Sequence, residues 1–148
     1  MTKSEQREEL FKLLFRAEFN DSEEMKTQKE LFIDERMNKP EEILLDDDDE
    51  VIHYMNEKEA NEVLAKAEDI LEKLPQIDNM LNEKVTGWDI SRIGKTEITI
   101  LRLAVYEISM DESIPLKVAI NEAVELAKKF GQDSSAGFVN GVLAKFTK

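Results

Sequence analysis

The chain has 148 residues, 41% of them hydrophobic, which is enough for one domain with an ordinary apolar core. Its formal net charge is −13, and it contains one histidine and no cysteine, so disulfide frameworks and thiolate metal sites are excluded. Only five glycines and three prolines are available for turns, and the many Leu, Lys, Glu and Ala residues favour long helices over strands.

The first predicted helix begins near the N-terminus. Apolar residues recur there at the i, i+3, i+4, i+7 spacing of a helix that buries one face. This stripe consists of Leu10, Leu13, Leu14 and Ala17, with Phe11 and Phe15 beside it. Asn20, Asp21 and Ser22 then mark a break and the N-cap of a second helix. The second helix has a poorer stripe, formed by Met25, Leu31, Phe32 and Met37.

The middle of the chain combines an acidic segment with two further helices. Residues 38–50 include Pro40 and an unbroken acidic run at 46–50, whose mutual repulsion and low helix propensity predict a mobile, solvated loop. Apolar spacing predicts a third helix over 56–73. Pro75 is expected in the first turn of a fourth helix, and Gly87 at its end.

The last third carries the strongest helical pattern. Residues 98–108 are apolar nearly all round, which is typical of the central helix of a bundle. Pro115 opens the next helix, and Gly131 is placed for a left-handed C-cap. The final helix is predicted to begin near Asp133 or Ser134, and its expected buried face is Phe138, Val139, Val142, Leu143 and Phe146. The whole pattern predicts an all-α single domain, residues 1–148, of about seven helices.

The charge is unevenly distributed along the chain. Residues 1–16 and residues 84–148 each carry a net charge of +1, whereas residues 17–83 carry −15. The two ends could therefore form a nearly neutral or locally positive face in an acidic protein. No stretch approaches the roughly 18 apolar residues of a membrane span, and the N-terminus lacks the apolar run of a signal peptide, so we expect a cytoplasmic protein.

Apparent catalytic and metal motifs fail on their spacing. Gly94, Lys95 and Thr96 resemble the end of a phosphate-binding loop, but the required first glycine is Asp89, and a helix start is the favoured interpretation. The calcium-loop spacing of Asp46, Asp48, Glu50 and Glu57 has Val51 where the sharp turn needs glycine.

His53 is the one histidine and has no cysteine to join it. Most transition-metal sites and the histidine-assisted nucleophile systems are thereby excluded. The chain has 33 acidic residues, which guarantees accidental carboxylate pairs, but none is framed by an apolar pocket pattern. We therefore predict a protein that is not an enzyme and needs no cofactor.

Basic residues extend the apolar stripe of the first helix toward the N-terminus. Lys3 and Arg7 lie on the same side of the helix as Leu10 and Leu14, and cations in this position could face a phosphate backbone. The alternative, that Lys3 and Arg7 simply belong to a frayed helix end with no binding role, explains these two residues equally well. Lys12 and Arg16 stand beside Glu8 and Glu9, and intrahelical ion pairs are the favoured interpretation of these four residues.

The C-terminal third resembles the signature of the NusB transcription antitermination factors. The matching blocks, with Trp88 and Arg92 before them, are residues 100–104, Tyr106-Glu107, Pro115, residues 117–123, residues 126–128, Phe130-Gly131 and residues 138–143. Near the N-terminus, Arg7-Glu8 and Leu13-Leu14-Phe15 match shorter elements of the family. Between residues 20 and 80 only the helical pattern is shared.

The resemblance implies a seven-helix domain that resembles two packed helical bundles. It also implies binding of the boxA element of nascent ribosomal RNA together with NusE, a small-subunit ribosomal protein, in a complex with other Nus factors and RNA polymerase. Some relatives form homodimers, and the sequence leaves this open. The matched RNA-binding positions are Lys3, Arg7, Phe15, Asp133, Ser134 and Phe138. Phe138 fits a base-stacking role and a core role equally well.

The sequence departs from the family where RNA contacts are expected. Relatives carry several consecutive arginines at the N-terminus, and this chain has Lys3, Ser4, Glu5 and Gln6 instead. Fewer phosphate contacts predict weaker RNA binding and a greater dependence on NusE, a basic protein that the acidic middle segment would attract. The alternative is a protein-only adaptor that docks such a partner without touching RNA. A NusB-like domain of an RNA methyltransferase would need a catalytic domain that this chain lacks.

Overall fold

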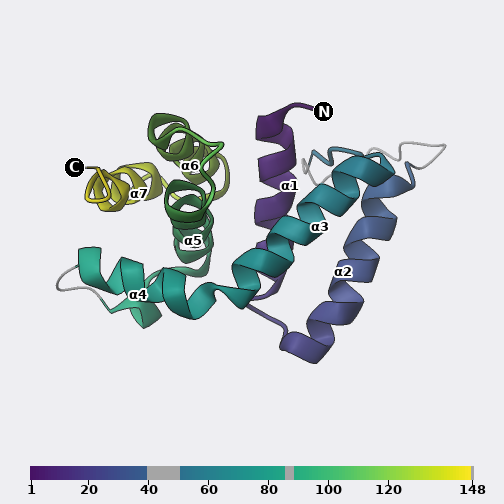
Figure 1. Ribbon diagram of the computed structural model, residues 1–148, viewed down its shortest axis with the longest axis horizontal. Coiled ribbons are helices and arrows are strands. Elements are labelled where there is room, and N and C mark those ends of the chain that lie inside the picture. Colours follow the sequence, from purple (N-terminus) through teal and green to yellow (C-terminus); the bar gives the residue numbers. More distant parts are fainter. Residues whose placement is uncertain (40–50, 86–88, 148) are drawn as a thin grey trace. The chain divides into compact units, whose positions relative to one another are not determined.

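The computed structural model describes residues 1–39, 51–85 and 89–147. In these ranges the chain forms seven α-helices, a short 3-10 helix and no strand, which confirms the predicted all-α class (Figure 1). The predicted mobile loop falls outside the described residues over 40–50, as do Asp46, Asp48 and Glu50 of the calcium template and the residues Gly87 and Trp88. Glu57, the last position of that template, is the first residue of α3. The chain divides into two compact units, Met1–Glu68 and Asp69–Lys148.

The first unit contains α1 (Lys3–Arg16), α2 (Ser22–Met37) and most of α3 (Glu57–Glu72). Each of these helices begins with a reciprocal capping box, in which the cap side chain and a glutamate three residues later each accept the other's backbone N–H. The three boxes are Thr2 with Glu5, Asp21 with Glu24, and Asn56 with Glu59. Asp21 is therefore the N-cap that the sequence predicted.

The apolar interior of the first unit is formed mainly by α1 and α3. The stripe predicted for α1 is buried, but half of the stripe predicted for α2 is not, because Leu31 and Met37 are 46% and 39% exposed. A helix turns by about 100° per residue, so Leu31 lies more than a quarter turn from the fully buried Phe32, outside the narrow buried side of α2. The buried apolar residues of the unit are Leu10, Phe11, Leu13, Leu14, Met25, Phe32, Met55, Ala60, Val63 and Ala67.

The second unit is organised around α5 (Lys95–Met110), which packs against α4 (Leu74–Lys84), α6 (Leu116–Phe130) and α7 (Ser135–Ala144). The short helix η1 (Ile90–Arg92) lies against α4. Nine residues of α5 are buried, which confirms its predicted central place. Pro75 lies in the first turn of α4, and α5 starts directly after Gly94, as predicted.

The predicted left-handed C-cap at Gly131 is wrong. Gly131 has φ −94° and ψ −169°, an extended backbone conformation open to any residue. Glycine is needed there because a Cβ atom would lie 2.5 Å from the Ser135 Cβ and 2.7 Å from the Ala127 carbonyl oxygen. The burial predicted for Phe138 and Phe146 is also incomplete, because both rings are half-buried.

Candidate functional site

The basic start of α1 is fixed by its capping box. The Glu5 amide donates to the Thr2 Oγ1 at 3.0 Å, and the Thr2 amide donates to the Glu5 Oε1 at 2.7 Å. The hydrogen bond from the Thr2 amide, followed by interaction with the Thr2 side chain, lowers the pKa of the Glu5 carboxyl group. Lys3 is exposed and Arg7 is half-buried one turn later on the same side of the helix. The structure therefore places the two predicted cations on a defined helical turn, with an ionised glutamate between them.

Phe15, the third predicted residue of this segment, lies in the middle of an aromatic row. Its ring stacks on Phe11 with centroids 5.9 Å apart and meets the edge of Phe19 at 5.2 Å. Phe11 is buried and Phe19 is 59% exposed, so the row runs from the interior to the surface. Phe15 is half-buried between them, and its ring is held by neighbours on both sides.

The ion pairs predicted along α1 are confirmed for Lys12 and wrong for Arg16. The Lys12 Nζ lies 3.0 Å from a Glu9 carboxylate oxygen and 3.7 Å from one of Glu8. Arg16 instead reaches α2, where its guanidinium lies 3.0 Å from the Glu35 carboxylate. Arg16 lies in the last turn of α1, which gives its long side chain access to the neighbouring helix.

A buried ion pair between α1 and α2 was not predicted. The Arg36 Nε lies 2.8 Å from the Glu9 Oε1, and the two residues are 3% and 0% exposed. The Arg36 guanidinium also lies 4.4 Å from the Phe32 ring centroid and 2.7 Å from the exposed Glu35. The sequence analysis assigned Glu9 to pairs within α1 and did not single out Arg36, because charged side chains are seldom fully buried. Arg36 follows the buried Phe32 by four residues, and this helical spacing was the signal that could have indicated a buried Arg36.

In the second unit, Asp133 and Ser134 form the exposed turn before α7, and Phe138 is half-buried in its first turns. The turn is held by Ser135, which is 2% exposed. The Ser135 hydroxyl accepts the Gln132 amide at 2.9 Å and donates to the Glu97 carboxylate of α5 at 2.6 Å. The structure thus brings Asp133, Ser134 and Phe138 together on one short stretch.

Several residues that carry the family resemblance tie α5 to its neighbours. The Arg102 guanidinium donates to both carboxylate oxygens of Asp78 in α4, each at 2.9 Å. The Tyr106 hydroxyl donates to the Asp69 carboxylate at 2.5 Å. This bond and one from Lys73 lower the pKa of Asp69, whereas burial and the same bond raise the pKa of Tyr106. These residues stabilise the second unit.

The predicted site residues therefore form two groups, one in each unit. Lys3, Arg7 and Phe15 share α1, and Asp133, Ser134 and Phe138 share the start of α7. In the described ranges 1–39, 51–85 and 89–147, no group of three or more histidine, cysteine or acidic side chains could hold a metal ion. Among the same residues no helix has the length and apolar character needed to cross a membrane.

These helices and segments define an all-α protein built from two helical units. The model of the NusB family matches residues 4–148, and the chain belongs to that family. It is 47% identical over 146 residues to the transcription antitermination protein NusB of Agathobacter rectalis, covering 99% of both chains. It is 43% identical over 145 residues to the protein of that name from Lachnoclostridium phytofermentans, covering 98% of each.

The solved structure of T. maritima NusB matches with a TM-score of 0.75 and 29% identity. The match covers 98% of this chain and 91% of that chain. The chain is thus a transcription antitermination factor of the NusB family, a regulatory protein that is not an enzyme.

Proposed function

We propose that this chain binds the boxA element of nascent ribosomal RNA together with NusE. In this proposal the complex joins other Nus factors on RNA polymerase in the cytoplasm and suppresses premature termination. Binding is the activity, and the chain acts as a single NusB-like domain. Membership of the NusB family supports the proposal, and so do the residues at the two candidate segments.

The observation that carries the RNA part is the defined basic start of α1. The Thr2–Glu5 capping box begins the helix at Lys3 and thereby fixes Arg7 one turn later. Cations on a rigid turn lose less freedom when they bind phosphate than cations on a disordered tail. Two such cations are fewer than the consecutive arginines of relatives, so we expect RNA binding without NusE to be weak and strongly weakened by salt.

The start of α7 supplies the second proposed contact. Asp133 and Ser134 are exposed and can hydrogen-bond to bases or sugars, and Phe138 is half-buried nearby in the chain. Single-stranded RNA is commonly held by base stacking on aromatic rings, which contributes roughly 1–3 kcal/mol per base. Ser135 holds this turn through its bond to Glu97, so the backbone is set before any ligand binds.

A protein-only adaptor is the second candidate function. It is favoured by the acidic composition of residues 17–39, which hold seven acidic and four basic side chains. Such a surface attracts a basic ribosomal protein and repels phosphate. The two candidates differ in whether the chain itself contacts RNA.

The first test is a titration of boxA RNA with the full chain, with and without the cognate NusE protein. RNA with a scrambled boxA sequence is the control. We expect weak binding of boxA by the chain alone and markedly tighter, sequence-dependent binding with NusE present. Tight binding of NusE with no preference for boxA over the scrambled RNA would favour the adaptor.

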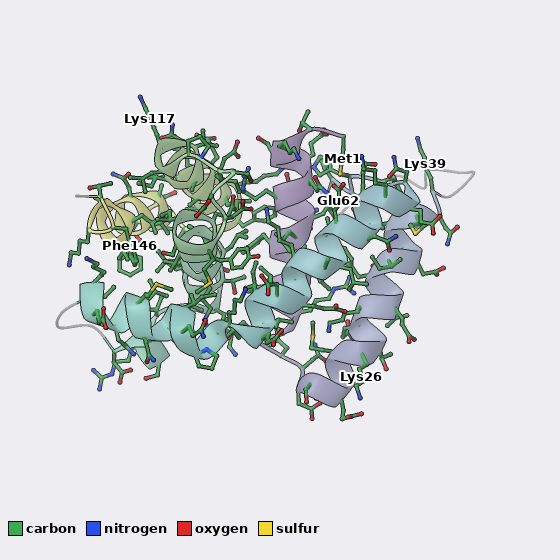
Figure 2. The ribbon with its side chains drawn as sticks, in the orientation of Figure 1. Met1, Lys26, Lys39, Glu62, Lys117 and Phe146 are labelled. Carbon is green, nitrogen blue, oxygen red and sulfur yellow. The ribbon has the colours of Figure 1, made fainter. Side chains whose placement is uncertain are left out.

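The second test assigns the RNA contacts to residues. Arg7→Ala should weaken boxA binding and reduce the salt slope by about one unit, because one phosphate contact is lost. The matched control is Lys26→Ala in α2, whose side chain is 69% exposed and points away from the unit (Figure 2). If the two substitutions have equal effects, Arg7 contributes only its general charge and makes no specific contact.

Phe138 requires a pair of variants, because its ring could stack on a base or support the core. Phe138→Leu keeps an apolar side chain of similar size and removes the aromatic face. We expect this variant to melt close to the native chain and to lose roughly 1–3 kcal/mol of RNA binding. Early melting with normal RNA binding by the folded fraction would assign Phe138 to the core.

A further inference from the structure

Residues 51–56 lie before α3 and are anchored at both ends, to α1 at Val51 and to α2 at Met55. The Lys12 Nζ donates to the Val51 carbonyl at 2.7 Å. At the other end of the segment, the Met55 amide donates to the Arg36 carbonyl of α2 at 2.9 Å, and the Met55 side chain is buried. His53 lies between these anchors with its side chain 14% exposed. The segment therefore presses its histidine against the N-terminal half of α1.

The His53 ring bridges two glutamates of α1. Its Nδ1 lies 3.2 Å from a Glu5 carboxylate oxygen, and its Nε2 lies 3.2 Å from one of Glu8. A carboxylate only accepts hydrogen bonds, and a neutral imidazole has one donor and one acceptor nitrogen. Both contacts are therefore satisfied at once only when the ring carries two protons and a positive charge.

Charged groups lie near the His53 ring, so a second proton on the ring would change the local charge balance. On α1 they are Glu5, Glu8 and Lys12, the last lying 3.7 Å from Glu8. On α3, Glu59 is paired with the chain's amino terminus at 3.1 Å. Glu5 and Glu8 lie in the same two turns of α1 as Lys3 and Arg7, on a different side of the helix, and their negative charge opposes phosphate binding in these turns. A charged His53 offsets them.

We infer that His53, in its doubly protonated form, clamps the first two turns of α1 and offsets the charge of the Glu5 and Glu8 carboxylates in the turns that carry Lys3 and Arg7, which strengthens RNA binding there. His53 is thus a positioning residue and does not itself contact the RNA. The inference rests on the proposed RNA-binding function. It predicts a direction: boxA binding is tighter when residue 53 carries a positive charge than when it is neutral, so binding by the native chain tightens as the pH falls.

The test compares three chains, the native protein, His53→Gln and His53→Lys, each titrated with boxA RNA at about pH 6 and about pH 8. Glutamine can bridge the glutamates without charge, and lysine supplies a permanent charge. We expect the native chain to gain about two- to five-fold in affinity at the lower pH beyond any gain shown by His53→Gln. This subtraction removes any pH dependence that does not come from residue 53. His53→Lys should bind tightly at both pH values.

A readout without RNA keeps the inference separate from the proposed function. At one pH near neutrality, amide hydrogen exchange in the first two turns of α1 should be faster in His53→Gln than in His53→Lys. Equal exchange and equal pH dependence in the native and His53→Gln chains would overturn the inference. If no chain binds boxA RNA, both the proposed function and the effect of His53 on RNA binding are wrong. An exchange difference found in that case would still support the bridging of Glu5 and Glu8 by His53.

Discussion

The helices of the two units begin in different ways. In the first unit α1, α2 and α3 each start with a reciprocal capping box. In the second unit α4, α5, α6 and α7 start at Lys73, Gly94, Pro115 and Ser134, and none of these residues makes a side-chain capping bond. Side-chain hydrogen bonds therefore hold the starts of the first set, whereas the starts of the second set lack them and depend more on what the helices pack against.

The interiors of the units differ in the same sense. The second unit buries a nearly continuous apolar helix, α5, so hydrophobic burial alone locates its helices. The first unit has weaker apolar stripes and includes a fully buried ion pair, Arg36 with Glu9. A unit with less apolar surface to bury gains more from local signals that fix where each helix begins.

Arg36→Met gives the largest expected effect and tests the interior of the first unit. Removing Arg36 takes away the 2.8 Å partner of the buried Glu9 Oε1 and leaves this carboxylate with Lys12 alone, so the free energy of unfolding should fall by up to about 3–5 kcal/mol in urea denaturation. The control is Glu35→Gln, because Glu35 is 46% exposed and its pair with Arg36 should contribute less than about 1 kcal/mol. Equal small losses would mean that water reaches Glu9.

Gly131→Ala tests the packing that replaces capping in the second unit. The new Cβ would collide with Ser135 and the Ala127 carbonyl, so the free energy of unfolding should fall by about 1–3 kcal/mol. Gly137→Ala in α7 is the matched control, because nothing lies within 4 Å of its Cβ position. This control should stabilise by about 0.4–1 kcal/mol, since alanine restricts the unfolded chain. Similar signs for both variants would contradict the close packing at Gly131.

Substitutions at the N-cap residues should have a smaller effect on stability, and they test most directly the difference in capping between the two units. Asp21→Ala removes the side chain that accepts the Glu24 amide at 2.8 Å, and should cost about 1 kcal/mol of unfolding free energy. Ser134→Ala at the start of α7 removes no capping bond and should change it by less than about 0.5 kcal/mol. Thermal melts of both variants measure the contrast. A larger loss for Ser134→Ala than for Asp21→Ala would reverse the distinction between the units.

Local signals in the sequence were enough for much of the fold. The Asp21 cap, the place of Pro75 and the start of α5 at Gly94 depend on neighbouring residues, and all three are confirmed. The Gly131 prediction failed because its cause is not local backbone geometry. Glycine is required there by Ser135, which the fold brings close and no spacing rule anticipates.

The candidate site was predictable to a lesser extent. Periodicity placed Lys3 and Arg7 on one side of α1, but their role was taken from the resemblance to a family. Sequence reasoning excluded a metal at His53 without finding Glu5 and Glu8, which lie 48 and 45 positions away in the chain. Arg16 was assigned to its own helix because the pairing with α2 depends on how two helices pack. Long-range charge pairs are set by tertiary structure.

The bond between Ser135 and Glu97 has a consequence for the order of folding. Helix α7 has glycine at 137 and 141 and no side-chain cap, so its ten residues have little tendency to form a helix alone. Its first turn is instead held by a carboxylate 38 residues earlier in the chain. Contacts of that sequence separation form late, because the intervening chain must first be ordered. Helix α7 should therefore join the second unit after α5 and α6 have paired, as the last step of a sequential assembly.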